Sequence, residues 1–111
     1  MTEPAAAQRI LGLVGLGMRA RLVVAGVDRV REAAKRGVLQ LAVVAPDAAR
    51  NSLDKVVPLL RARRIEMVSA PSAAALGHAV GRQQTTVVGI TDRDLARGIR
   101  AIVRSDPVGV A

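Results

Sequence analysis

The chain has 111 residues, with 17 Lys and Arg against 9 Asp and Glu, which gives a formal net charge of +8. Half of its residues are hydrophobic, which argues against wholesale disorder, and the length suffices for one domain with a core. Phe, Tyr and Trp are absent, which disfavours the modules that stack single-stranded bases on aromatic side chains. We predict a single domain over residues 1–104 and a flexible tail over residues 105–111.

The absence of Cys excludes a disulfide framework and a thiolate metal site, as expected of a protein in a reducing cytoplasm. The first residues, MTEPAAAQR, lack the cationic and apolar regions of a secretion signal. The longest apolar runs are shorter than a membrane span. We therefore predict a cytoplasmic protein that is not embedded in a membrane.

The excess of positive charge favours a polyanionic partner such as RNA. The basic side chains are almost all Arg, with Lys only at Lys35 and Lys55, and a guanidinium has the planar donor geometry that suits phosphate. A compositional bias toward Arg and Ala is an alternative explanation for the choice of Arg over Lys. It does not explain the excess of basic over acidic residues.

A first helix is expected from about Pro4 to Met18, with Thr2 as its N-cap. Apolar residues at helical spacing predict its buried side. They are Ala6, Ile10, Leu13 and either Leu16 or Gly17.

The stretch Leu22–Gly37 reads as a short strand over 22–25, a break at Gly26, and a basic helix from Val27 to Arg36 that Gly37 ends. A helix that begins at a glycine exposes unpaired backbone N–H groups, and with the helix dipole these form an anion site. We interpret this corner as a contact for RNA phosphate. The alternative is that the two glycines only delimit the helix.

The next strand is predicted over Leu39–Ala45, with a turn or loop over 47–51 and Ser52 capping a helix from Leu53 to about Arg63. A third strand follows over Ile65–Ser69.

Ser72 is predicted to cap a short helix through Val80, and a fourth strand covers Thr85–Thr91. Asp92 then caps a last helix to about Val103. This alternation of helices and strands predicts an α/β protein, a three-layer α/β/α sandwich around a mixed four-stranded sheet.

No arrangement of residues indicates catalysis. His78 is the only histidine, and a lone His is more often a packed or surface residue than a general base. Asp92 and Asp94 are explained by capping of a helix start. The chain offers no cluster of metal ligands and no phosphate-binding loop after a strand. We predict a non-enzymatic protein with no cofactor and no metal.

The order of the expected elements and several short sequence strings resemble those of a known family. It is the kink-turn-binding ribosomal protein superfamily of the archaeal ribosomal protein L-seven-Ae type, and within it the small bacterial homologues. The most specific are LGHAVG at Leu76–Gly81 and VVGITD before the last helix. The weaker ones are Gly15-Leu16, Arg19-Ala20, Val24 with Gly26, Arg36-Gly37, and APDA from Ala45.

The resemblance implies that two elements contact RNA, namely a helix N-terminus against the sheared G·A pairs of a kink-turn and a loop over a splayed nucleotide. The helix residues would be Gly26, Val27, Asp28 and Arg29. The loop residues would be Val68, Ser69, Ala70, Pro71 and Ser72, with Ala45, Pro46 and Asp47 nearby.

The chain departs from the pattern of that family at the helix and at the loop. Family members that bind kink-turns carry Asn-Glu where this chain has Asp28-Arg29, and Lys where it has Glu32. Ala70-Pro71 stands in place of a larger apolar residue, and Arg21 in place of a turn glycine.

The leading hypothesis is a non-catalytic RNA-binding protein whose partner is structured RNA, ribosomal or kink-turn-like, in company with ribosomal or other ribonucleoprotein proteins. Its cationic surface would be formed by Arg21, Arg29, Arg31 and Lys35, on one face with Gly26. The alternative is a protein-interaction module on the same fold that has lost specific kink-turn recognition. A third reading is a substrate-binding domain separated from an RNA-modifying enzyme.

Overall fold

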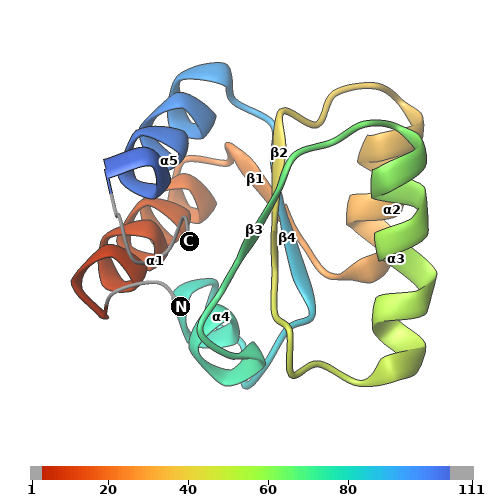
Figure 1. Ribbon diagram of the computed structural model, residues 1–111, viewed down its shortest axis with the longest axis horizontal. Helices are drawn as coiled ribbons and strands as arrows, with labels where there is room; N and C mark the ends of the chain where they lie inside the picture. The colour runs from red at the N-terminus through yellow and green to blue at the C-terminus, as the bar shows by residue number, and fades with distance from the viewer. Residues whose placement is uncertain (1–3, 106–111) are drawn as a thin grey trace.

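The computed structural model describes residues 4–105 and contains five helices and one four-stranded sheet (Figure 1). In chain order the elements are α1 (Pro4–Arg19), β1 (Val23–Ala25), α2 (Val27–Lys35), β2 (Leu41–Val44), α3 (Arg50–Ala62), β3 (Met67–Ser69), α4 (Ala73–Ala79), β4 (Val87–Ile90) and α5 (Arg93–Ser105).

The strand order is β1-β4-β2-β3. β4 pairs antiparallel with both β1 and β2, while β2 and β3 are parallel, so the sheet is mixed. Helices α2 and α3 cover one face of the sheet, and α1, α4 and α5 cover the other (Figure 1). The predicted three-layer α/β/α sandwich is therefore confirmed.

Each face of the sheet has its own aliphatic core. Toward α1, α4 and α5 the largest fully buried side chains include Leu41, Leu76 and Ile99. Toward α2 and α3 they include Val30, Val56 and Leu60. Because the chain has no Phe, Tyr or Trp, aliphatic side chains fill the interior.

The topology divides the connecting segments between two ends of the sheet. Strands β1, β2 and β3 end, and β4 begins, at the lower end in Figure 1, which we call the Gly26 end. It comprises residues 26–29, 45–50, 69–73 and 80–86. The other connections meet at the upper end, which we call the Arg64 end. It comprises residues 19–22, 35–40, 61–66 and 91–94.

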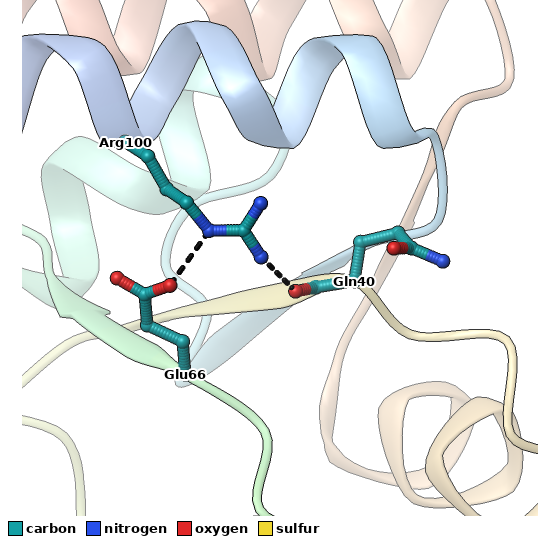
Figure 2. A network of polar contacts seen from close by, with 3 residues as sticks. All are labelled: Gln40, Glu66 and Arg100. Carbon is teal, nitrogen blue, oxygen red and sulfur yellow. Dashed lines mark hydrogen bonds and ion pairs between the residues drawn. The ribbon is translucent and has the colours of Figure 1, made fainter.

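A polar clasp at the Arg64 end joins α5 to the sheet (Figure 2). Arg100 donates from Nε to Glu66 Oε1 at 2.7 Å and from Nη2 to the backbone carbonyl of Gln40 at 2.7 Å. Glu66 precedes β3 and Gln40 precedes β2, so one guanidinium holds α5 against the starts of two adjacent strands.

Most predicted element boundaries lie within two residues of the observed ones, but the start of α3 is wrong. The helix begins at Arg50 after Ala49, and Ser52 lies inside its first turn, where its N–H donates to the Ala49 carbonyl at 3.0 Å. No side chain caps this helix. The serine therefore indicated the wrong position, because capping by a side chain is a preference and not a requirement.

Smaller expectations concern the buried side of α1 and the two ends of the chain. On α1 the buried position is Gly17, whereas Leu16 is 56% exposed. Ser105 belongs to α5 and not to the tail. The cap assigned to Thr2 and the rest of the tail, 106–111, fall outside the described residues. Within residues 4–105 no helix is long and apolar enough to cross a membrane.

Candidate nucleic-acid interface

The start of α2 offers unpaired hydrogen-bond donors at the Gly26 end. Gly26 is the N-cap and has φ 98° and ψ 157°, a conformation that strongly favours glycine. No side chain caps the helix, and among the described residues no acceptor pairs with the N–H groups of Val27, Asp28 and Arg29. These donors and the positive end of the helix dipole favour an anion.

The loop after β2 is tied to the start of α4. Asp47 Oδ1 accepts a hydrogen bond from the Ala73 N–H at 2.7 Å, and the Ser72 hydroxyl, as predicted, accepts one from the Ala75 N–H at 3.0 Å. The Asp47 contact fixes the 45–50 and 69–73 segments relative to each other, and the Ser72 cap fixes the start of α4 itself.

The segment after α4 completes the end of the sheet. Its path is set by Gly77, because a Cβ at this position would lie 2.4 Å from the Cα of Gln84, where no side chain fits. The Arg82 N–H donates to the Gly77 carbonyl at 2.8 Å, and the Thr85 N–H donates to the Ala73 carbonyl at 3.0 Å. The segment is thus held against α4.

This path brings the Arg82 side chain to the start of α2. A Cβ built on Gly26 would lie 3.2 Å from Arg82 Nη1, so the guanidinium lies in close contact with the glycine. Arg82 is exposed. An exposed cation therefore lies beside the unpaired N–H groups of α2, and both attract the same kind of group, a phosphate.

Between these segments lies an open hollow of about 330 Å³. It is bounded by both uncapped helix starts, α2 and α3, and by the segments that precede α4 and β4. Its lining residues are Gly26, Val27, Asp47, Ala48, Ala49, Ser52, Ala73, Gln84, Thr85 and Thr86.

One buried residue that lines the hollow has a hydroxyl without a hydrogen-bond partner among the described residues. Thr85 is only 7% exposed, the one buried polar or charged residue of the described chain. Its hydroxyl makes no hydrogen bond to a described residue, and no fully buried side-chain polar atom there lacks a partner. The hydroxyl therefore opens into the hollow, where it can donate to or accept from a ligand.

Several residues predicted for the RNA surface do meet here. Gly26, Val27 and Asp47 line the hollow together, and Asp28 is exposed at the start of α2. In the two loops, Pro46, Ser69 and Pro71 are exposed, and Ser72 is half-buried. In contrast, the side chains of Ala45, Val68 and Ala70 belong to the core, so they offer no surface to a nucleotide.

The expectation that four cations share one face with Gly26 is wrong. Arg21 and Lys35 lie at the Arg64 end, which is at the other end of the strands from Gly26. The Arg31 guanidinium donates to the backbone carbonyl of Lys55 on α3. Arg29 lies on another side of α2, in a depression that it shares with Val24, Glu32, Arg36 and Thr91. A helix turns 100° per residue, so cations close together in sequence point in different directions.

The sequence-based interpretation missed Arg82, Gln84 and Thr85 as site residues, because it treated the first two as part of a connection and Thr85 as the start of the fourth strand. The only signal lay next to a string that it did single out, since Arg82 directly follows LGHAVG. Their role depends on the contact between Gly77 and Gln84, which is a tertiary contact and leaves no periodic pattern in the sequence. His78 is exposed on α4, and within 4–105 no three or more His, Cys, Asp or Glu side chains are grouped so that they could hold a metal ion.

The chain belongs to the ribosomal protein L7Ae/L30e/S12e/Gadd45 family, whose model matches residues 8–99. The predicted family resemblance is therefore confirmed. A curated relative is the RNA-binding protein YlxQ of Bacillus subtilis (strain 168). It is 30% identical over 91 residues, which cover 82% of this chain and 91% of that protein.

Two solved structures are similar. A protein of unknown function from Bacillus halodurans has a TM-score of 0.76 at 26% identity, covering 86% of this chain and 96% of that one. The Giardia lamblia 15.5kD RNA binding protein has a TM-score of 0.79 at 21% identity, covering 97% of this chain and 92% of that one. At that identity the second likeness shows the fold alone.

Proposed function

We propose that this protein binds structured RNA without catalysing a reaction, and that the Gly26 end receives a sharply bent backbone with one unstacked nucleotide. The observation that carries the proposal is the hollow itself, which is lined by the start of α2 with its unpaired N–H groups and by Thr85, and beside which the Arg82 guanidinium lies against Gly26. Membership of the family and the printed name of its B. subtilis relative support RNA as the ligand.

The chemistry of the hollow suits a phosphate at its rim and a base inside. The N–H groups at the start of α2 and Arg82 would hold the phosphate. The chain has no Phe, Tyr or Trp for stacking, so the base would be held by hydrogen bonds to the polar lining and by contact with Val27 and Ala73.

The residues at the start of α2 bear on the kink-turn. Asp28 and Arg29 are both exposed where family members that bind kink-turns carry Asn-Glu. A carboxylate accepts hydrogen bonds, as an amide oxygen does, so Asp28 could still accept from the amino group of a guanine edge. We propose that a kink remains the preferred geometry, because only a bent strand presents phosphate to α2 and a base to the hollow at once.

A protein-interaction role on the same fold finds less support. Within residues 4–105 the large hydrophobic side chains that are exposed are Leu16 and Val38. Leu16 lies on α1 and Val38 follows α2, and these two helices cover opposite faces of the sheet. Apolar interaction sites are contiguous, and two separated side chains do not form one.

The proposal is tested by a mobility-shift comparison of a kink-turn RNA with an unkinked duplex of equal length, at two salt concentrations. We expect tighter binding to the kinked RNA and a loss of several-fold for Arg82→Gln on that RNA. The matched control is Arg9→Gln, which removes an exposed arginine from α1 and should change little. Equal affinity of the wild-type protein for both RNAs, or equal effects of the two variants, would contradict the proposal.

A further inference from the structure

The positive charge of the protein is concentrated away from the hollow. The residues of the Gly26 end include three basic ones, Arg29, Arg50 and Arg82, together with Asp28 and Asp47. The side chain of Arg29 lines a depression that Arg36 also lines. The connections at the Arg64 end carry eight basic residues, all of them exposed, and we call these eight the Arg64 cluster. They are Arg19, Arg21, Lys35, Arg36, Arg61, Arg63, Arg64 and Arg93.

The acidic residues at this end are each engaged. Glu66 pairs with Arg100 at 2.7 Å, as Figure 2 shows. Asp92 Oδ2 accepts the Leu95 N–H at 2.8 Å as the cap of α5. Asp94 pairs with Arg97 at 3.4 Å. Within the part of the chain that the structure describes, only Arg36 of the cluster has an ion pair, with Glu32 at 3.7 Å, and both side chains are largely exposed.

Cations in the last turn of a helix have an ordinary explanation, because they complement the helix dipole. That explanation covers Arg19, Lys35 and Arg61. It does not cover Arg93, which is the first residue of α5 and stands where the dipole disfavours a cation.

Two further members of the cluster adopt a backbone conformation that favours glycine. Arg21 has φ 62° and Arg64 has φ 57°, and no other non-glycine residue described has a positive φ. The left-handed region costs a non-glycine residue roughly 1 kcal/mol, and glycine is the usual residue at such turns and helix ends. Both positions lie at the Arg64 end. The chain therefore keeps two guanidinium groups there against local preference, which is typical of a functional surface.

We propose that the Arg64 cluster is a second RNA-binding surface, which contacts the phosphate backbone of a duplex separate from the RNA at the Gly26 end. Seven of the eight residues are Arg, whose planar donors suit phosphate oxygens. Protein interfaces usually have an apolar centre, and the only large apolar side chain exposed at this end of the described chain is Val38.

The dimensions of the protein separate the two surfaces. The described chain extends 31 × 28 × 27 Å, while charges are screened over about 8 Å at physiological salt. The cluster therefore adds little to binding at the hollow, and acts on RNA that reaches the Arg64 end itself. The protein would then join two RNA segments. This inference is independent of the proposed function, since the two surfaces share no residue.

The test uses the full chain and an unkinked RNA duplex. In Arg21→Gly/Arg64→Gly, glycine adopts the left-handed conformation without strain, so the free energy of unfolding should stay the same or rise. The affinity for the duplex should fall about fivefold or more. The dependence of affinity on salt should fall by about 1–2 in log–log slope, because each phosphate contact contributes roughly 0.7–0.9. Arg21→Lys/Arg64→Lys should retain most of the affinity. The charge-matched control is Arg9→Gln/Arg104→Gln, which removes two exposed arginines outside the cluster and should bind as the wild type does.

A capture experiment tests the joining of two RNAs. Protein bound to an immobilised kink-turn RNA should retain a labelled duplex, and the Arg21→Gly/Arg64→Gly variant should lose it while still binding the immobilised RNA. Unchanged duplex affinity in this variant, or an equal loss in the control, overturns the inference. Stronger competition by polyglutamate than by duplex would assign the surface to an acidic protein, which also overturns it. Because duplex binding is measured on the free protein, a failure at the hollow is seen separately with the kinked RNA.

Discussion

Asp47 Oδ1 accepts a hydrogen bond from the Ala73 N–H at 2.7 Å, and this contact joins the loop after β2 to the first residue of α4. The two residues are 26 positions apart and both line the hollow. The carboxylate thereby holds two of the lining segments together while it places a negative charge in the site proposed for RNA. The hydrogen bond of Asp47 should favour RNA binding and its negative charge should oppose it. Two substitutions separate these effects.

Asp47→Asn keeps an acceptor for the Ala73 N–H and removes the charge, whereas Asp47→Ala removes both. A hydrogen bond to a charged group contributes about 1.5–3 kcal/mol, less at a partly exposed site. We expect Asp47→Ala to lower the free energy of unfolding by about 1 kcal/mol and to weaken binding of kinked RNA. Asp47→Asn should bind that RNA at least as tightly as the wild type does. Urea unfolding and filter binding measure the two effects. Weaker binding by Asp47→Asn would mean that the carboxylate itself contacts the RNA.

Gly26→Ala tests the backbone at the start of α2. A side chain is strained at φ 98° and would lie 3.2 Å from Arg82 Nη1, so we expect a loss of stability of about 1–3 kcal/mol together with weaker RNA binding. Gly12→Ala is the matched control, because nothing lies within 4 Å of the added Cβ on helix α1. It should raise stability by about 0.5–1 kcal/mol. Thermal unfolding of both variants checks the opposite signs.

Gly77→Ala tests how the segment after α4 is held. The new Cβ would lie 2.4 Å from the Cα of Gln84, so the segment that carries Arg82 must move. We expect a destabilisation of about 1–3 kcal/mol from overpacking, with altered amide resonances in residues 81–86. If the resonances of that segment stayed in place, the close approach of α4 would not determine its path.

Thr85→Val isolates the hydroxyl at the floor of the hollow. The two side chains have similar shapes, and the hydroxyl has no partner among residues 4–105, so stability should be unchanged or slightly higher. A hydrogen bond to RNA contributes about 0.5–1.5 kcal/mol, which predicts that affinity for kinked RNA falls between twofold and twelvefold. Thr86→Val, at a half-buried neighbour in the same lining, serves as the comparison. An unchanged affinity in Thr85→Val would show that the base does not reach this depth.

The clasp between Arg100 and Glu66 should contribute modestly to stability. The two side chains are 27% and 48% exposed, so solvent and salt screen the pair. A double-mutant cycle with Arg100→Gln and Glu66→Gln should give a coupling energy of about 0.5–1 kcal/mol at low salt, smaller at high salt. A coupling energy that salt leaves unchanged would contradict this description.

The sequence was sufficient to predict the layers and most element boundaries, because local signals determine them. Ser72 and Asp92 cap the helices that they were expected to cap, and Ala6 and Ile10, expected on the buried side of α1, are buried. The start of α3 was missed because Ala49 caps the helix without a side-chain bond.

The site was harder to predict, because its parts meet only in three dimensions. Gly26 was identified from a local signal, namely a glycine before a helix. The approach of Arg82 depends on Gly77, and the separation of Arg21 from Gly26 depends on strand direction. Neither relationship is visible in the charge or periodicity along the chain. For this reason the four cations expected on one face with Gly26 lie on different parts of the surface.

The central claim is that RNA binds at the Gly26 end, and an NMR titration of the labelled protein with a kink-turn RNA tests it most directly. We predict that the largest amide shifts fall on Val27, Asp28 and Arg29 and on residues 81–86, with smaller shifts at 47–49. Shifts confined to the outer faces of α1 and α5, with the start of α2 unchanged, would contradict the account.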